Sequence, residues 1–293
     1  MGTPATIVEP RRSSSSLWSN CRPNIQRRIN ALLNLQADYF RCRVEFYRHL
    51  QDLQYAFSAK FEQILDQRRK LIEGSSGPLS DASLSSAREP RGLPDFWSIV
   101  LKNLNTLDYA VQPRDESCLK HLLDIRCLLH PVNAQSTGFT LEFHFSPNNP
   151  YFTQTVLTKE YLIRIELDDA NPYRSYDGPE VDRCYGCPIT WTSDHNLTVR
   201  TRHRRLRHKA TGEIRWVQIE ESTRSFFEFF SPPVVPADGP NDMLDEAQMR
   251  LEADIEFGLL LKQRVLPRAV LYYTGEVLSV VHDDDELSSE SSQ

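Results

Sequence analysis

Apolar and polar side chains follow a helical repeat over the fifty residues from Asn24 to Glu73. This stretch contains no proline and no glycine, so nothing in it breaks a helix. Large apolar or neutral side chains recur at alternating steps of four and three, which is the spacing of a coiled-coil seam. Arg43 and Arg68 interrupt the pattern. The seam comprises Ile25, Ile29, Leu32, Gln36, Tyr39, Phe46, Leu50, Leu53, Phe57, Phe61, Ile64 and Leu71.

A continuous helix over residues 23–73 would be about 75 Å long, which exceeds the width of a small domain. Burying each large seam residue contributes roughly 1.5–3 kcal/mol, so a bare seam on a monomer is unfavourable. We therefore predict that this helix self-associates in a homodimer. The alternative is an amphipathic helix that lies on its own domain. The residues expected at the dimer interface are Ile29, Leu32, Tyr39, Phe46, Leu50, Leu53, Phe57, Phe61 and Ile64.

The flanking segments have the composition of disordered chain. Residues 1–22 contain prolines and a serine run and predict a disordered leader. Gly74 is a natural end for the long helix, and residues 74–92 predict a flexible linker rich in Ser, Gly and Pro. Residues 282–293 form a short acidic tail.

Between residues 93 and 281 the pattern becomes that of a globular α+β domain. Helical spacing predicts helices near 96–107, 116–129 and 244–265. Alternation of apolar and polar residues predicts strands at 139–145 and 156–167, a short strand at 189–191, and a long hairpin over 197–219. A run of antiparallel strands between helices is the order expected for this fold class.

Charge is distributed unevenly along the chain. The net charge is −6, but residues 231–293 alone carry thirteen Asp/Glu and four Lys/Arg, so the rest must carry +3. This asymmetry indicates a charged macromolecular partner. The N-terminus lacks the apolar core of a signal peptide, and no apolar run is long enough to cross a membrane. We expect no membrane partner and reduced thiols for the six cysteines.

Catalytic and metal-binding motifs are weak. Cys184 and Cys187 form a CxxC pair, but zinc requires four ligands and no second pair follows. The chain has no glycine-rich phosphate loop and no arrangement that indicates a nucleophile with its base. We therefore expect a protein that is not an enzyme and that uses no metal or cofactor.

One stretch is strongly basic, with no acid among its cations. It predicts a nuclear localisation segment or a phosphate-binding patch on the hairpin. The arginines at 200, 202 and 204 share one face if the stretch is a strand. No aromatic residue lies among them, which argues against stacking of single-stranded bases. The residues are Arg200, Arg202, Arg204, Arg205, Arg207 and Lys209.

Acidic residues provide the other candidate surface, suited to a basic protein. They lie in one loop, on the late helix, and in the tail. Each group alone has the composition of an ordinary solvated surface. The candidates are Asp168, Asp169, Asp177, Glu180, Asp182, Glu252, Asp254, Glu256, Asp283, Asp284, Asp285 and Glu286.

Several sequence blocks, in order, resemble the nucleosome assembly protein family of histone chaperones. They cover most of the chain, from about Pro23 to Glu276, so chance similarity is remote. The blocks are RINAL at 28–32, GLPDFW at 92–97, LEFHF at 141–145, VLTK at 156–159, DGPE at 177–180, SFFEFFSPP at 225–233 and PRAVLYYTGE at 267–276.

The resemblance implies a fold and a function. Family members dimerise through a long antiparallel helix pair above an α+β dome, and their acidic surfaces bind core histones, both the peripheral and the central pair. The hairpin at 197–219 would carry a nuclear localisation segment, so the expected location is the nucleus and the cytoplasm. The acidic tail is shorter here than in many members, which bears on the strength of histone shielding.

Two other functions remain open. A dimeric chromatin-associated adaptor could keep the fold and lack efficient assembly activity. A direct DNA binder could use the hairpin arginines, although the acidic C-terminal balance makes us expect no substantial DNA binding.

Overall fold

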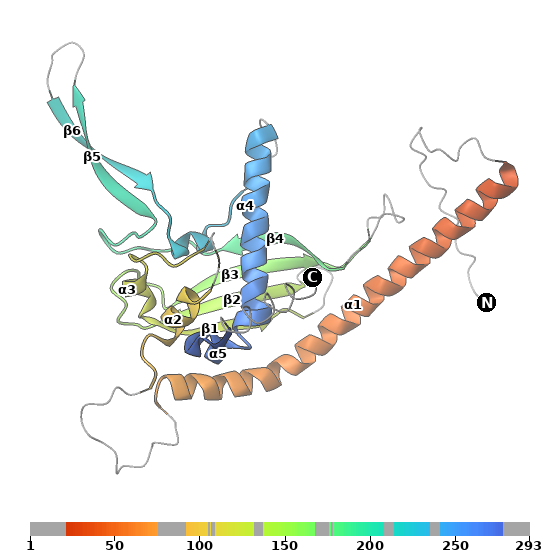
Figure 1. Ribbon diagram of the computed structural model, residues 1–293, viewed down its shortest axis with the longest axis horizontal. Helices are drawn as coiled ribbons and strands as arrows, with labels where there is room; N and C mark the ends of the chain where they lie inside the picture. Colours follow the sequence, from red (N-terminus) through yellow and green to blue (C-terminus); the bar gives the residue numbers. More distant parts are fainter. Residues whose placement is uncertain are drawn as a thin grey trace, which may run out of the picture.

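The fold is described from a computed structural model, in which residues 22–75, 92–104, 106, 109–131, 137–167, 176, 178–207, 214–234 and 241–277 are described. The predicted leader, linker and acidic tail fall almost wholly outside these residues. The chain is α+β, as predicted, with one long helix, an antiparallel sheet with helices packed on it, and a projecting hairpin (Figure 1).

The long helix α1 (Pro23–Ile72) is present, as predicted, and is 50 residues long. Pro23 occupies the first turn, where its missing N–H costs no helical hydrogen bond. The helix ends at Ile72, with Glu73 as its C-cap residue, and Gly74 follows with a positive φ of 70°. Such a backbone conformation favours glycine.

The main sheet has four antiparallel strands in the order β1-β2-β3-β4. These are β1 (Leu122–Leu129), β2 (Gly138–Phe145), β3 (Val156–Arg164) and β4 (Glu180–Gly186). The prediction of a helix over 116–129 is wrong: only α3 (Glu116–Leu119) is helical, and β1 follows it. Pairing of Ile125 with Phe143 and of Cys127 with Leu141 stabilises the strand in place of a helix. The expected short strand at 189–191 is only an isolated bridge between Phe152 and Trp191.

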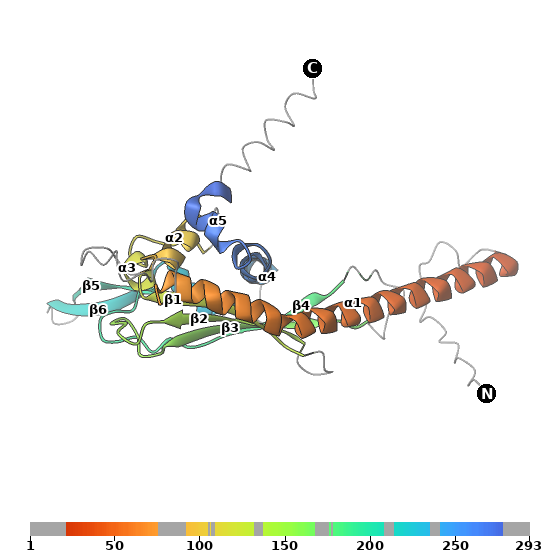
Figure 2. The same cartoon turned by 90° about the horizontal axis from the view of Figure 1, so that it is seen from below.

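Helices cover one face of this sheet, as Figure 2 shows. They are α2 (Phe96–Lys102), α4 (Asn241–Leu260), which continues as the π-helical turn η2 (Leu261–Val265), and α5 (Ala269–Thr274). The 3-10 turn η1 (Phe226–Phe230) buries four phenylalanines in the same core. Gly258 of α4 permits close packing on β3, because an added Cβ would lie 2.3 Å from the Tyr161 ring.

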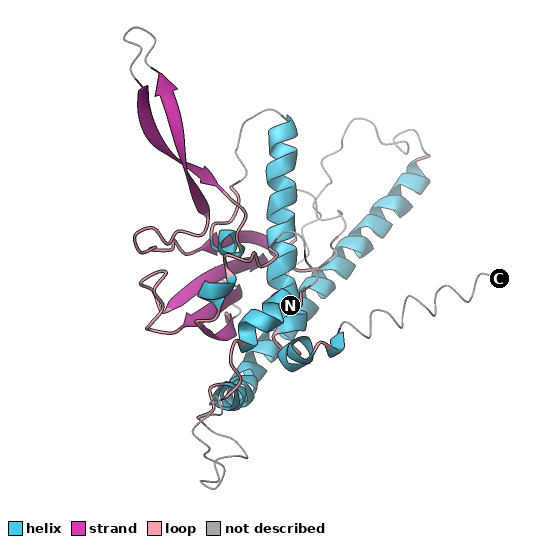
Figure 3. Ribbon diagram, turned by 60° about the vertical axis from the view of Figure 1, so that its left-hand side comes forward, coloured by secondary structure: helices cyan, strands magenta, loops and turns pink. Residues whose placement is uncertain are grey.

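The hairpin is a separate two-stranded sheet of β5 (Val199–Arg207) and β6 (Ile214–Ser222). It projects from the body of the domain, as does the N-terminal half of α4 (Figure 3). The predicted hairpin at 197–219 is therefore present, with its second strand extending to Ser222.

Helix α1 docks on its own domain at two places. Near its middle, Phe40 and Val44 pack with Ile165 and Tyr176. Near its C-terminal end, Arg68 donates a hydrogen bond of 2.5 Å to the carbonyl oxygen of Leu266. Beyond these contacts the helix extends past the sheet (Figures 1 and 2).

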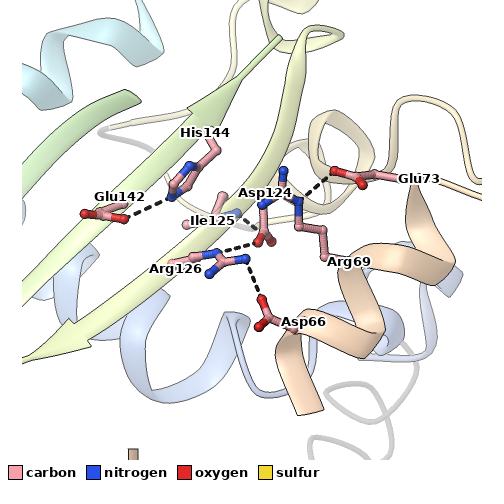
Figure 4. A network of polar contacts seen from close by, with 8 residues as sticks. All are labelled: Asp66, Arg69, Glu73, Asp124, Ile125, Arg126, Glu142 and His144. Atoms are coloured by element: carbon pink, nitrogen blue, oxygen red, sulfur yellow. Dashed lines mark hydrogen bonds and ion pairs between the residues drawn. The ribbon is translucent and has the colours of Figure 1, made fainter. Parts of the chain in front are cut away.

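A polar network joins the second docking site to the sheet (Figure 4). Arg126 of β1 donates to Asp66 of α1 at 2.7 Å and to Asp124 at 3.0 Å. The Asp124 carboxylate is buried and also accepts a hydrogen bond from the N–H of Ile125. This network fixes the position of the helix against the edge strand.

Candidate partner-binding surfaces

One face of α1 is uncovered and strongly apolar. Leu32 is 65 % exposed, Ile64 61 % and Phe61 58 %. Tyr39, Phe46, Leu50, Leu53 and Phe57 are also exposed, whereas Ile29 is half-buried. Ala37, Phe40 and Val44, three of the five buried residues of α1, lie on a different face. Helix α1 therefore combines the two alternatives: one face lies on its own domain, and the seam is available to a partner.

The acidic candidates do not form one cluster in the described part of the chain. Glu180 and Asp182 lie on β4, where Glu180 pairs with Arg164 at 3.2 Å and Asp182 with Arg183 at 3.2 Å. Glu252 and Glu256 are exposed on α4. The remaining candidates fall outside the described residues; they are Asp168, Asp169, Asp177, Asp283, Asp284, Asp285 and Glu286.

Asp254 was expected at an acidic partner surface, and this expectation is wrong. Its side chain is fully buried, and Lys159 Nζ donates to its carboxylate at 2.6 Å. The hydroxyl groups of Tyr109 and Tyr161 donate to the same carboxylate, at 3.1 and 3.2 Å. Burial lowers the pKa of Lys159 and raises the pKa of Tyr161. Asp254 thus holds α4 on the sheet and cannot contact a basic partner in this fold.

Two further carboxylates, which the sequence did not single out, lie on the sheet face opposite the helices. Glu142 of β2 accepts from His144 at 3.0 Å, and Glu160 of β3 lies 3.9 Å from His130. The alternation of Thr140, Glu142 and His144 with buried phenylalanines was the signal that could have identified this face. Glu160, whose side chain is 40 % exposed, is the more accessible of the two.

A groove of about 730 Å³ lies between the middle of α1 and the chain after β3. Its charged residues are of both signs, and Arg48 lies 3.7 Å from Glu166 across it. This mixture gives the groove no preference for a strongly basic partner. The lining residues are Arg41, Val44, Glu45, Arg48, His49, Asp52, Glu166 and Leu167.

The basic candidates lie on the projecting hairpin. Arg200, Arg202 and Arg204 share one face of β5, and Arg205 points to the other. Arg202 pairs with Glu221 at 3.0 Å. Arg207 lies in the strand, but its side chain, like all of Lys209, is outside the described part.

The thiols of the CxxC pair, Cys184 and Cys187, pack against the core of the domain. Cys187 Sγ accepts a hydrogen bond from the Thr158 N–H at 3.1 Å. Burial raises the pKa of Cys184 to about 11, and the nearby Asp254 carboxylate adds to the shift. In the described part of the chain, no group of three or more metal-ligating side chains converges, and no helix has the length and hydropathy needed to cross a membrane.

Comparison with known proteins gives one consistent result. The family model for nucleosome assembly proteins matches residues 27–276, which is most of the chain. The chain belongs to the nucleosome assembly protein family. The family model covers both docking sites of α1, the sheet, the hairpin and α5.

Relatives in this family cover nearly the whole chain. Nucleosome assembly protein 1-like 1 of Xenopus tropicalis is 39 % identical over 291 residues, covering 91 % of this chain and 72 % of its own length. The Homo sapiens protein of the same name is 37 % identical over 89 % of this chain and 71 % of its own length.

Solved structures of the family share the fold. Nucleosome Assembly Protein 1 from Plasmodium knowlesi aligns with a TM-score of 0.56 at 26 % identity, covering 88 % of this chain and 99 % of that one. A malaria parasite nucleosome assembly protein aligns with a TM-score of 0.54 at 24 % identity over the same shares of the two chains. These matches confirm the α+β fold with its long N-terminal helix.

Proposed function

We propose that this protein is a histone chaperone that binds core histones through acidic surfaces and promotes nucleosome assembly. The observation that carries the proposal is membership of the nucleosome assembly protein family over residues 27–276. Relatives that match about nine-tenths of the chain are named nucleosome assembly proteins. The function requires no catalytic residue, because no covalent bond is made or broken.

Charge explains how such a protein would act. Histones are strongly basic and bind DNA through many phosphate contacts, which form in unproductive arrangements when nothing competes with them. Carboxylates on a chaperone compete with phosphates for the same arginines and lysines and weaken those contacts. The chain carries 40 Asp/Glu against 34 Lys/Arg and concentrates the excess of acid in its C-terminal part.

We propose that the working form is a homodimer joined through the α1 seam. The seam residues provide apolar area on a face of α1 that is largely exposed in the described structure. Two antiparallel copies of α1 would cover each other and place their two domains at opposite ends of the pair. A histone would then meet carboxylates from both protomers.

For the histone-contacting residues we propose two groups, Glu180 with Asp182 on β4 and Glu252 with Glu256 on α4. All four carboxylates reach solvent in the described structure. Glu160, on the sheet face turned away from α2, α4 and α5, is a third candidate. We propose that the tail acids at 283–286 add to these surfaces. The proposed partners are both the peripheral and the central histone pairs. The proposed location is the nucleus and the cytoplasm.

The experiment is a fluorescence titration of each labelled core histone pair at near-physiological salt. Full-length protein is compared with a 1–281 truncation and with the double variants Glu180→Gln/Asp182→Asn and Glu252→Gln/Glu256→Gln. A matched control, Asp38→Asn/Glu62→Gln, removes two exposed carboxylates of α1 at positions outside both groups. Submicromolar binding that weakens in a candidate variant but not in the control supports the proposal. Absence of binding to either pair would overturn it and favour the adaptor function.

A further inference from the structure

In the outer part of the described hairpin, two arginines that form no ion pair with any described residue lie beside an exposed tryptophan. Strand register pairs Arg204 with Val217 and Arg205 with Trp216. The Trp216 side chain is 65 % exposed, and both arginines are exposed. Trp216 is 11 residues away from Arg205 in the sequence, so only the hairpin brings the ring beside the basic stretch.

Charge varies along this ribbon. Near the domain, the register places Arg200 opposite Glu221 and Thr201 opposite Glu220, and Arg202 pairs with Glu221 at 3.0 Å. Farther out, the residues opposite Arg204 and Arg205 are apolar or aromatic. The ribbon therefore has a compensated base and a cationic outer part that we call the distal patch, defined by Arg204, Arg205 and Trp216.

The chemistry of the distal patch identifies the class of ligand. An exposed indole offers a flat aromatic face on which a nucleobase can stack, and guanidinium groups form bidentate contacts with phosphate. Arg205 shares its face with Trp216, while Arg204 lies on the other face of the same edge strand and is long enough to reach around it. We propose that the distal patch binds single-stranded nucleic acid, with one base stacked on Trp216 and neighbouring phosphates on Arg204 and Arg205.

An acidic peptide is the competing ligand for the same arginines. It would satisfy the two charges but would leave the indole without a stacking partner, so the aromatic ring favours nucleic acid. A regular duplex keeps its bases stacked on each other and offers Trp216 no free base. This proposal does not depend on histone binding, because it rests on the ribbon alone. It also revises the sequence-based argument, which found no aromatic residue among the arginines.

The test uses the full-length protein and a fluorescein-labelled oligothymidylate of about 15 nucleotides, with an abasic strand of equal length for comparison. Fluorescence anisotropy measures both affinities over a series of salt concentrations. We expect Trp216→Ala to weaken binding of the oligothymidylate about tenfold and to leave binding of the abasic strand unchanged. Trp216→Phe keeps an aromatic face and should retain most of the affinity.

Removing the charges of Arg204 and Arg205 should affect the binding of both strands, unlike the change at Trp216. Arg204→Gln/Arg205→Gln should weaken binding of both strands and reduce the slope of log affinity against log salt by roughly 1.4, which is two phosphate contacts. Arg200→Gln, at the compensated base, is the matched control and should change affinity less than twofold. The proposal is overturned if Trp216→Ala binds oligothymidylate as wild type does. It is equally overturned if polyglutamate or a duplex of the same length displaces the oligonucleotide as efficiently as unlabelled oligothymidylate.

Discussion

Lys159 and Asp254 form an ion pair of 2.6 Å in which both side chains are fully buried. Lys159 projects from β3, and Asp254 from α4, so the pair joins the sheet to the helix that covers it. The ammonium group also donates to the carbonyl oxygen of Phe229 at 2.7 Å, and it lies 4.8 Å from the centre of the Phe229 ring. Each polar atom of the pair thus has partners, which is the condition for tolerating buried charge.

Breaking this pair should destabilise the domain strongly. Lys159→Met leaves the Asp254 carboxylate buried without its cation, and we expect the free energy of unfolding to fall by about 3–5 kcal/mol. Urea denaturation followed by circular dichroism measures the change. Adding Asp254→Leu should restore only part of it, because the hydroxyl groups of Tyr109 and Tyr161 then lose their acceptor. A loss below about 1 kcal/mol in the single variant would show that the pair is not buried in solution.

The two ends of the Arg126 network should differ in their contribution to stability. Asp124 is 2 % exposed, whereas the Asp66 side chain is 50 % exposed. Arg126→Met removes the cation that faces the buried carboxylate, so we expect a loss of about 3 kcal/mol. Asp66→Asn breaks only the solvated ion pair between α1 and β1, and we expect a loss of less than about 1 kcal/mol. Chemical denaturation of both variants gives the comparison, and equal losses would contradict the difference in burial.

The sequence was informative where a local pattern determines structure. The alternating steps of four and three and the absence of Pro and Gly between Asn24 and Glu73 sufficed for α1, and alternation sufficed for β2 and β3. It failed for β1, since the apolar run LLDIRCLL has no clear period and only pairing with β2 makes it a strand. It also missed β4, whose charged residues carry no alternation and which is placed by its pairing with β3.

Asp254 shows why the candidate acids could not be sorted from composition alone. In the sequence it resembles Glu252 and Glu256, its neighbours on α4. Its spacing of three and seven residues from the buried Phe257 and Leu261 places it on the apolar side of the helix, and this was the available signal. Lys159 gave a similar signal, because it alternates with Leu157 and Tyr161 on the buried face of β3, but nothing in the sequence paired it with Asp254 on a distant helix. The same limit applied to Trp216 and Arg205, which only the hairpin register brings together.

Thiol reactivity should follow burial. Burial raises the pKa of Cys127 to about 11 and that of Cys184 to about 11, whereas Cys42 is exposed on α1. Because the thiolate is the nucleophile, iodoacetamide at about pH 8 should label Cys42 well before Cys127 or Cys184. Mass spectrometry of timed, quenched samples gives the order. Labelling of Cys184 as fast as that of Cys42 would contradict the burial and would reopen a redox role for the CxxC pair.

The raised pKa of Cys127 predicts how the free energy of unfolding depends on pH. Above the ordinary thiol pKa of 9.0, an unfolded Cys127 loses its proton, whereas the folded protein retains it until about pH 11. The folded state then binds more protons than the unfolded state, so the stability that Cys127 contributes falls as pH rises across this window. The difference in unfolding free energy between wild type and Cys127→Ala, measured by urea denaturation, should therefore decrease from pH 9 to pH 11. A difference that is constant with pH would show that this thiol titrates normally.

The exposed seam of α1 gives the last prediction. Leu50 and Phe57 lie on the seam, and neither belongs to the cluster with which α1 docks on its own domain. Leu50→Asp/Phe57→Asp places two charges in the proposed helix–helix interface, where burying an unpaired carboxylate is strongly unfavourable. We expect a folded monomer, because the contacts of Phe40, Val44 and Arg68 with the domain are retained.

Light scattering coupled to size-exclusion chromatography measures the mass of the double variant, and circular dichroism checks its fold. Glu62→Gln, an exposed change outside the seam, is the control and should remain a dimer. A double variant that keeps the dimer mass would show that the protomers associate through another surface.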